Sequence, residues 1–408
     1  MNKVAHAWID AAEASERLGV SRPTLYAYVS RGFVRSQATA GSSRERSYSR
    51  DDIERLRRRT EERRAPDKAT ARALQWGMPI LESSIALIDG RNLYYRGHDA
   101  TVLARTRRVD EVASLIWTGN LEVPPAGTSP AALRVSPAAR EPFLARAHAM
   151  LASAAARDPL ALDLRPPAVA IAGYRILRLL TAAATGRNPG TETVDQALGR
   201  HWNVNARGVD LVRAALIACA DHELNVSSFT ARCVASAGSH PYAVVSAGLA
   251  ALEGPRHGGA TARVEAMLDS MRNVRGLETA LAARLRRGEQ VDGVGHPLYR
   301  DGDPRAQLLL DLIADQYGRS PEGRFIAAFA RAAARVTGDL PNVDFGLAAL
   351  SRTLRLPAGS PLVIFAIGRS IGWIGHAIEQ YSTGQLIRPR ARYVGVLPIQ
   401  PKSIPPDA

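Results

Sequence analysis

Apolar residues recur at helical spacing along most of the chain. Between residues 83 and 385 they follow the three- and four-residue intervals of amphipathic or buried helices. The predicted helices are 107–117, 141–156, 168–184, 209–220, 227–237, 243–253, 260–270, 305–318, 321–336, 345–355 and 361–381. Strand-like alternation occurs only briefly, at residues 85–95, and proline-rich breaks separate several of the helices. The pattern predicts a mainly α fold.

The first 64 residues carry a different pattern. A helix is predicted over 10–18, where a glycine ends it, and Ser21 can cap a second helix. The Gly-, Ser- and Arg-rich segment 33–48 predicts a hairpin wing. A third helix opens at Ser49, which has capping-box spacing to an aspartate three residues later. These elements predict a small separate domain.

The composition sets the broad class of the protein. The 408 residues are 46% apolar and 23% charged, which allows two or more domains and a sizeable core. The longest uncharged stretch, 234–252, is interrupted by Gly, Ser, His and Pro, so it predicts a buried helix and not a membrane span. The cysteines, Cys219 and Cys233, are too few for a disulfide framework or a four-cysteine zinc site. We expect a soluble, cytoplasmic protein without membrane association.

The net charge of +14 comes almost entirely from arginine. Lysine occurs only at Lys3, Lys68 and Lys402, which argues against Schiff-base, pyridoxal and Walker-type phosphate chemistry in residues 76–393. Arginine suits bidentate recognition of carboxylate and phosphate. Residues 1–64 hold 14 basic and 9 acidic residues, a denser positive charge than in the rest of the chain. Genome composition also produces arginine excess, so position must decide which arginines act.

The N-terminal pattern resembles the winged helix-turn-helix of MerR-type regulators and excisionases over about residues 8–60. The Gly-Val-Ser turn and the Arg-Pro-Thr-Leu-Tyr helix start carry this resemblance. It implies a recognition helix for the major groove of duplex DNA and a wing, including Arg35, that meets phosphates. The expected DNA-binding residues are Arg22, Tyr26, Arg31, Arg44 and Arg46. A protein-interaction module with a solvated basic face is the alternative. The predicted domains are 1–64 and 76–408, joined by a linker at 65–75.

Four polar segments interrupt the apolar helices of the larger domain. They are Asp-His-Glu-Leu-Asn at 221–225, Gly-Pro-Arg-His-Gly-Gly-Ala at 254–260, Gly-Val-Gly-His-Pro-Leu-Tyr-Arg-Asp-Gly-Asp-Pro-Arg-Ala at 293–306, and Pro-Asn-Val-Asp-Phe-Gly at 341–346. Arg369 and an Arg-Pro-Arg segment at 388–390 follow. Each alone could be an ordinary turn, cap or surface charge. Together, in this order, they resemble the citrate synthase family from about residue 83 to residue 395.

This resemblance implies a large helical domain with a smaller helical subdomain at about 263–356, a homodimer, and condensation of acetyl-CoA with oxaloacetate to citrate and CoA. Propionyl-CoA, giving 2-methylcitrate, is the related reaction. The implied roles are Asp344 as base, His257 as enolate stabiliser, His296 at the oxaloacetate carbonyl, His222, Arg305 and Arg369 as oxaloacetate ligands, and Arg388 as a ligand from the neighbouring subunit. The resemblance implies no metal and no permanently bound cofactor, with CoA as co-substrate.

The chemistry explains why such a set is needed. A carboxylate must take a poorly acidic methyl proton, the enolate needs a hydrogen-bond donor, and a dicarboxylate calls for arginine forks. Pro297 and Gly346 depart from the family pattern near the expected acyl-CoA site, which leaves the acyl preference open. The intact His257, His296 and Asp344 favour an active enzyme. The basic N-terminal domain favours the alternative, a transcriptional regulator that senses acyl-CoA or di- or tricarboxylates; a structural protein with an inactive site is the third interpretation.

Overall fold

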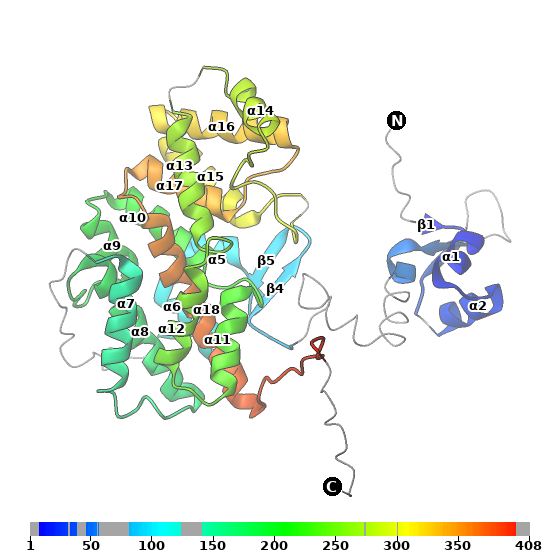
Figure 1. Ribbon diagram of the computed structural model, residues 1–408, viewed down its shortest axis with the longest axis horizontal. Coiled ribbons are helices and arrows are strands. Elements are labelled where there is room, and N and C mark those ends of the chain that lie inside the picture. The colour runs from blue at the N-terminus through cyan, green and yellow to red at the C-terminus, as the bar shows by residue number, and fades with distance from the viewer. Residues whose placement is uncertain are drawn as a thin grey trace, which may run out of the picture. The chain divides into compact units, whose positions relative to one another are not determined.

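The computed structural model describes residues 8–31, 33–38, 46–54, 56, 81–123, 141–272, 275–299 and 301–396. The chain divides into two compact units, Met1–Glu82 and Ser83–Ala408 (Figure 1). The predicted linker at 65–75 and Arg44 lie outside the described residues. Each unit is described by itself.

The first unit is a small α/β domain built on a three-stranded sheet of order β1-β3-β2. Its elements are β1 (Trp8–Ile9), α1 (Ala11–Leu18), α2 (Arg22–Ser30), β2 (Ser36–Ala38) and β3 (Arg46–Ser49), and residues 50–54 begin a further helix. Strands β2 and β3 pair antiparallel, which confirms the predicted hairpin wing. The core consists of Ile9, Ala14, Leu18, Leu25, Val34, Tyr48 and Ile53.

Two of the capping predictions in this unit are wrong in detail. Ser21 stands at the N-cap of α2, but its hydroxyl lies 3.0 Å from Thr24 Oγ1 and makes no cap hydrogen bond. The Ser49 hydroxyl does accept from the Asp52 N–H, at 3.4 Å. The Asp52 carboxylate, however, accepts from Arg35 instead of returning to the helix start, because the wing places that guanidinium beside it. An ion pair with the wing replaces the reciprocal capping box.

The second unit is almost entirely helical. A small antiparallel sheet, β4-β5-β6, precedes the helices. The elements are β4 (Ala86–Asp89), β5 (Asn92–Tyr95), β6 (His98–Asp99), α5 (Ala100–Thr106), α6 (Val109–Thr118), α7 (Phe143–Ala155), α8 (Pro166–Thr185), α9 (Val194–His201), α10 (Ala206–Ala218), α11 (Val226–Ser236), α12 (Pro241–Leu252), α13 (Gly259–Ser270), α14 (Leu277–Arg286), α15 (Pro304–Tyr317), α16 (Pro321–Thr337), α17 (Val343–Leu354) and α18 (Ser360–Thr383). The mainly α prediction is confirmed, although α5, α9 and α14 were not predicted.

Helix α18 is the central element of this unit. It packs against α6, α8, α10, α11, α12, α13 and α17, and it buries Arg369, Trp373 and His376 completely. Helices α8 and α18 are long and apolar enough to cross a membrane by length and composition, yet 78% and 89% of their apolar windows are buried within the protein. Core helices of globular proteins have the same character.

Helices α13 to α17 lie together at one end of the second unit (Figure 1). Within this group α13 packs on α17, α14 on α16, and α15 on both α16 and α17. The group covers residues 259–354, close to the range expected for the smaller subdomain. Helices α10 and α18 pack against α17. The polar segments that carry the candidate chemistry lie at the connections between α10 and α11, α12 and α13, α14 and α15, and α16 and α17.

Candidate active site

Two of the polar segments are joined directly by their backbones. Val294 forms an antiparallel bridge with Pro341, and the Gly295 N–H donates to the Leu340 carbonyl at 2.8 Å. The Asn342 side chain continues this pairing, because its Nδ2 donates to the Gly295 carbonyl at 3.0 Å. The loop that carries His296 is therefore fixed beside the first turn of α17, which carries Asp344.

Asp344 lies in the first turn of α17 and is half-buried. Asn342 caps this helix by accepting from the Asp344 N–H at 3.1 Å. Burial raises the pKa of Asp344 to about 6, although the positive charge of Arg305 acts in the opposite direction. A carboxylate with a pKa near neutral pH can both take up and release a proton, as a general base must.

His222 and His296 lie against each other. Their rings are edge to face with centroids 5.1 Å apart, and His222 Nε2 lies 3.0 Å from the Tyr299 hydroxyl. Burial, and then the charge of Arg305, lowers the pKa of His222 well below its usual range and that of His296 to about 4. Both imidazoles are neutral near pH 7, so they can act as hydrogen-bond donors without adding positive charge.

Arg305 is buried and lies beside these histidines at the start of α15. Its Nε and Nη2 donate to the two carboxylate oxygens of Asp303 at 2.9 and 2.7 Å. Burial opposes the charged form of Arg305, but the Asp303 carboxylate outweighs it and raises the pKa of the guanidinium. Asp303 also accepts from the Val343 N–H at 3.0 Å, so it ties the arginine to α17. Two donors of Arg305 are thus already engaged within the protein.

His257 follows α12 and is held by the start of α11. Its Nε2 lies 2.9 Å from the Ser227 hydroxyl, which also accepts from the Trp373 Nε1–H at 3.2 Å. The single hydroxyl hydrogen is left for either Asn225 Oδ1, at 3.0 Å, or His257 Nε2. In the second arrangement the neutral imidazole carries its hydrogen on Nδ1. Burial, followed by the charge of Arg369, lowers the pKa of His257 to about 4.

Arg369 supplies a buried guanidinium whose two terminal nitrogens are available to a ligand. It is completely buried, and its Nε donates to the Cys219 carbonyl at 2.7 Å. Its Nη1 and Nη2 have no hydrogen-bond partner among the described residues. The Phe365 ring contacts both Arg369 and His257, with the guanidinium carbon 4.8 Å from the ring centroid and the imidazole centroid 5.7 Å from it. Because burying an unpaired donor is costly, a free guanidinium fork in this position fits an anionic ligand.

Arg388 is not brought into this cluster within one chain. Helix α18 rises roughly 20 Å between Arg369 and its C-terminal end, and Arg388 follows in the exposed segment beyond it. Among the described residues, no group of three or more His, Cys, Asp or Glu side chains is arranged to hold a metal ion.

The two departures from the family pattern have different surroundings. Pro297 is exposed next to His296. Gly346 instead faces α15, where an added Cβ would lie 3.1 Å from Leu309 Cδ1 and 3.2 Å from Ala306 Cα. The absence of a side chain at position 346 therefore allows α15 and α17 to pack closely, and the space is filled by α15. Residues 344 and 346 also differ by about 200° around the helix, so Gly346 does not share the face of Asp344.

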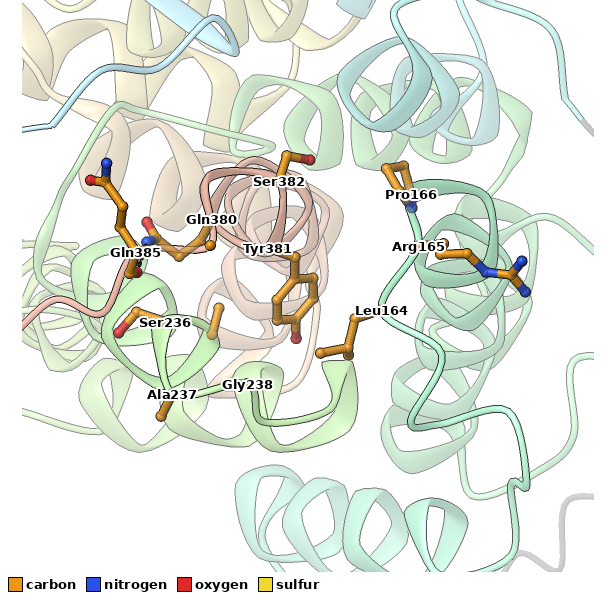
Figure 2. A pocket seen from close by; sticks show the side chains of 12 residues that line it. Leu164, Arg165, Pro166, Ser236, Ala237, Gly238, Gln380, Tyr381, Ser382 and Gln385 are labelled. Atoms are coloured by element: carbon orange, nitrogen blue, oxygen red, sulfur yellow. Dashed lines mark hydrogen bonds between the residues drawn. The ribbon is translucent and has the colours of Figure 1, made fainter.

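A cavity of about 620 Å³ lies elsewhere, at the C-terminal end of α18. Figure 2 shows Tyr381 projecting into it from α18, while Arg165 at the start of α8 points away. None of the candidate catalytic residues lines this cavity. The chemistry of the side chains, and not the volume of a cavity, therefore defines the candidate site.

The predicted DNA-contact residues of the first unit lie on its surface. Arg22, Tyr26, Arg31 and Arg46 are exposed, and Tyr26 is 51% exposed although it is a large aromatic residue. Arg35 differs from the expectation for the wing, because Asp52 holds its guanidinium.

Several site residues were not assigned a role from the sequence. Tyr299, Asp303 and Ser227 all contact predicted catalytic or binding residues. The first two lie inside the polar segment 293–306. Ser227 lies two residues beyond the segment 221–225. Only their proximity in sequence to the predicted residues could have indicated them.

Comparisons with known proteins agree with this architecture. The model of the citrate synthase C-terminal domain family matches residues 73–390, and that of the MerR helix-turn-helix family of regulatory proteins matches residues 10–60. The solved citrate synthase of Thermotoga maritima has a TM-score of 0.63 at 26% identity and covers 79% of this chain and 96% of its own. That of Thermoplasma acidophilum, in a ternary complex with carboxymethyl coenzyme A and oxaloacetate, has a TM-score of 0.69 at 23% identity, covering 82% and 98%. The second unit therefore has the citrate synthase fold.

Relatives identified by sequence extend this result. Citrate synthase 2 of Bacillus subtilis is 38% identical over 200 residues, which are 48% of this chain and 53% of that protein, so the match spans about half of that relative. The 2-methylcitrate synthase of Shewanella oneidensis is 30% identical over 353 residues, 76% of this chain and 91% of its own. The citrate synthase of Haloferax volcanii is 30% identical over 361 residues, 78% and 94%. The chain belongs to the citrate synthase family and carries a MerR-type helix-turn-helix region at its N-terminus.

Proposed function

We propose that the protein condenses acetyl-CoA with oxaloacetate to give citrate and free CoA, with propionyl-CoA as a related substrate. The observation that carries the proposal is the free fork of the buried Arg369 beside neutral histidines and a carboxylate of raised pKa. A dicarboxylate substrate would pair with the free fork of Arg369. Proton removal next to a thioester needs the carboxylate as base and the neutral histidines as hydrogen-bond donors. The solved complex of the Thermoplasma acidophilum relative contains ligands of these two classes.

The reaction divides among these residues. Asp344 removes a proton from the thioester methyl group, and the electron pair moves towards the thioester oxygen, to which His257 donates a hydrogen bond. The resulting carbon nucleophile adds to the keto carbon of oxaloacetate, and His296 donates a hydrogen bond to the oxygen that becomes the alkoxide. The alkoxide takes up a proton to become the hydroxyl of the product, and Asp344 releases the proton it removed to water before the next turnover. Water then cleaves the thioester, which releases citrate and the CoA thiol. His222, Arg305 and Arg369 bind the dicarboxylate.

We further propose a cytoplasmic homodimer in which Arg388 of one chain binds the dicarboxylate in the site of the other. The position of Arg388 beyond the end of α18 supports this, because the residue lies far from its own chain's Arg369. Residues 1–64 act as one domain, 76–408 as the catalytic domain, and about 263–356 as the smaller subdomain around the site.

Product analysis tests the proposed reaction. The full-length protein is incubated with oxaloacetate and either acetyl-CoA or propionyl-CoA, and the products are identified by mass spectrometry. We expect citrate from the first mixture and 2-methylcitrate from the second, and the ratio of the two kcat/KM values gives the acyl preference. Formation of neither product by folded protein would contradict the proposal.

The pH dependence of turnover follows from Asp344. The base acts in its ionised form, so kcat is expected to fall as the pH drops through about 6, the pKa that burial gives this carboxyl group. His257 and His296, with pKa values of about 4, remain neutral across this range. A pH–rate profile at saturating substrates checks this. An acid limb centred near the ordinary aspartate pKa of about 4 would show that burial does not control the base.

A regulatory role is the second candidate function, and the first unit supports it. Its helix-turn-helix fold presents Arg22, Tyr26, Arg31 and Arg46 to solvent, as a surface for phosphates and base edges requires. In this case residues 1–64 bind duplex DNA, and the second unit senses acyl-CoA or di- or tricarboxylates. Binding and catalysis can coexist in one chain.

Salt dependence tests the DNA interface. Removing residues 1–64 is expected to abolish binding to duplex DNA and to leave CoA release largely intact. For the full chain, affinity should fall by ~0.9 log unit per log unit of salt for each neutralised phosphate. Replacing Arg31 by alanine should reduce the magnitude of this slope by the contribution of about one phosphate contact. Arg17→Ala is the control and should leave the slope unchanged, because the Arg17 guanidinium is already paired with Glu13 and Glu54. Salt-insensitive binding would count against the interface.

A further inference from the structure

Helix α18 donates three hydrogen bonds to residues 219–221, the segment directly before His222. The donors lie on one face of the helix, at residues 369, 372 and 376, and the acceptors are consecutive in sequence. The contacts are Arg369 Nε to the Cys219 carbonyl (2.7 Å), the Gly372 N–H to the Ala220 carbonyl (2.9 Å), and His376 Nε2 to Asp221 Oδ1 (3.1 Å). The last contact joins two side chains that have no assigned role in the reaction.

Both members of this last pair are completely buried. A carboxylate only accepts hydrogen bonds, so His376 Nε2 carries the hydrogen, while Nδ1 has no partner among the described residues. The other oxygen of Asp221 accepts from the Glu223 N–H at 3.1 Å. Glu223 has a φ of 52°, an unusual backbone conformation that this short turn stabilises. Both oxygens of Asp221 therefore have a hydrogen-bond partner.

Asp221 is also a negative charge close to Arg369, and it favours the charged guanidinium there. In the described part of the chain, however, Arg369 forms no ion pair with it, and Nη1 and Nη2 remain free. The approach of the carboxylate to α18 is close, because an added Cβ at Gly372 would lie 2.4 Å from Asp221 Oδ1. The carboxylate is therefore engaged by His376 and the Glu223 N–H, and not by Arg369.

We propose that His376 is a positioning residue: by donating to Asp221 it holds this carboxylate away from Arg369 and keeps the guanidinium fork free for a carboxylate of the substrate. Without this donor, Asp221 Oδ1 loses its partner in a buried environment. Arg369, whose charged form Asp221 already favours, offers the unpaired donors Nη1 and Nη2 to it. The internal carboxylate then competes with the substrate for the same fork. The inference rests on the proposed function, since it takes the ligand of Arg369 to be a dicarboxylate.

The test compares His376→Leu with His376→Gln in the full-length protein. Leucine fills the space without a donor, whereas the glutamine amide nitrogen can occupy a position near that of Nε2. We expect His376→Leu to weaken oxaloacetate binding, measured by calorimetry without acyl-CoA, about 10- to 100-fold, the usual effect of losing a charged hydrogen bond. The KM for oxaloacetate rises in parallel, while kcat and the KM for acetyl-CoA change less than about threefold. His376→Gln should restore most of the affinity.

A second variant separates competition from general damage. Adding Asp221→Asn to His376→Leu removes the competing charge, so oxaloacetate affinity should recover in part instead of falling further. Tyr242→Phe is the matched control: Tyr242 is a buried donor to the Asp158 carboxylate, at 2.7 Å, outside the candidate site. Its removal should leave oxaloacetate affinity unchanged. If His376→Leu does not fold, His376→Asn, too short to reach Asp221, takes its place.

The outcomes are distinct. Unchanged oxaloacetate affinity in the donor-free variant, or equal losses in kcat and in both KM values that glutamine does not correct, would overturn the positioning role. A further loss of affinity on adding Asp221→Asn would also overturn it. Failure of the proposed function appears differently, as wild-type protein that neither binds oxaloacetate nor releases CoA.

Discussion

Replacement of Asp344 by alanine is expected to lower kcat by roughly two to four orders of magnitude, the usual contribution of a positioned general base. The carboxylate stands in the first turn of α17, and burial raises its pKa to about 6. Without it, water is left to take a weakly acidic proton. The dicarboxylate ligands Arg305 and Arg369 remain, as does His296 at the keto carbonyl, so oxaloacetate binding measured by calorimetry should change little.

A matched replacement controls for the loss of charge. Asp311 is a half-exposed aspartate of α15 that lies 2.7 Å from the Gln307 amide. Asp311→Ala should leave kcat within a factor of about two, since surface substitutions seldom alter a site at a distance. Asp344→Ala protein that retained wild-type turnover would mean that another group is the base.

Two inactive variants are expected to restore activity when their subunits are exchanged. If Arg388 acts in the partner's site, a mixed dimer of Asp344→Ala and Arg388→Ala chains gathers both changes in one site and leaves the other intact. Random exchange of equal amounts then gives about a quarter of the wild-type number of sites. Each variant alone should be severely impaired, because a dicarboxylate in a closed site needs its guanidinium forks.

The control for this experiment uses a chain that carries both changes. Mixed with Asp344→Ala, it can form no intact site, so no activity should return. Turnover is measured as CoA release, and native mass spectrometry confirms that exchange has taken place. Exchange without recovery in the first mixture would place Arg388 in its own chain's site or outside catalysis.

The helices of the second unit were predictable from the sequence to the extent that their apolar spacing is regular. Helix α18 was predicted within a few residues because its apolar residues run almost without interruption. Helices α9 and α14 were not predicted. Helix α9 has few apolar residues, and α14, although rich in leucine and alanine, buries only Leu281. Packing of α9 against α8 and α10, and of α14 against α16, stabilises them. Helix α8 begins at Pro166, two residues before the predicted start at 168, since proline fits the first helical turn.

The candidate catalytic residues could be named from the sequence, but the hydrogen bonds that hold them and their neighbours in place could not. His257, His296 and Asp344 stand in segments whose residue types already indicate chemistry. The contact of Ser227 with His257, and that of Asp221 with His376, join positions 30 and 155 residues apart. Such contacts depend on how α11 and α18 pack, and no local pattern encodes that packing. The same holds for Gly346, which the sequence placed near the acyl site and which the structure packs against α15.

Release of the CoA thiol tests the central claim most directly. Purified full-length protein is mixed with acetyl-CoA and a thiol reagent, and oxaloacetate is then added. We predict that thiol appears only after oxaloacetate is added, in amounts that follow the oxaloacetate supplied, and that Asp344→Ala protein shows this release at a rate lower by roughly two to four orders of magnitude. Thiol release that is independent of oxaloacetate, or no release by folded wild-type protein, would contradict the assignment of this site as a condensing enzyme.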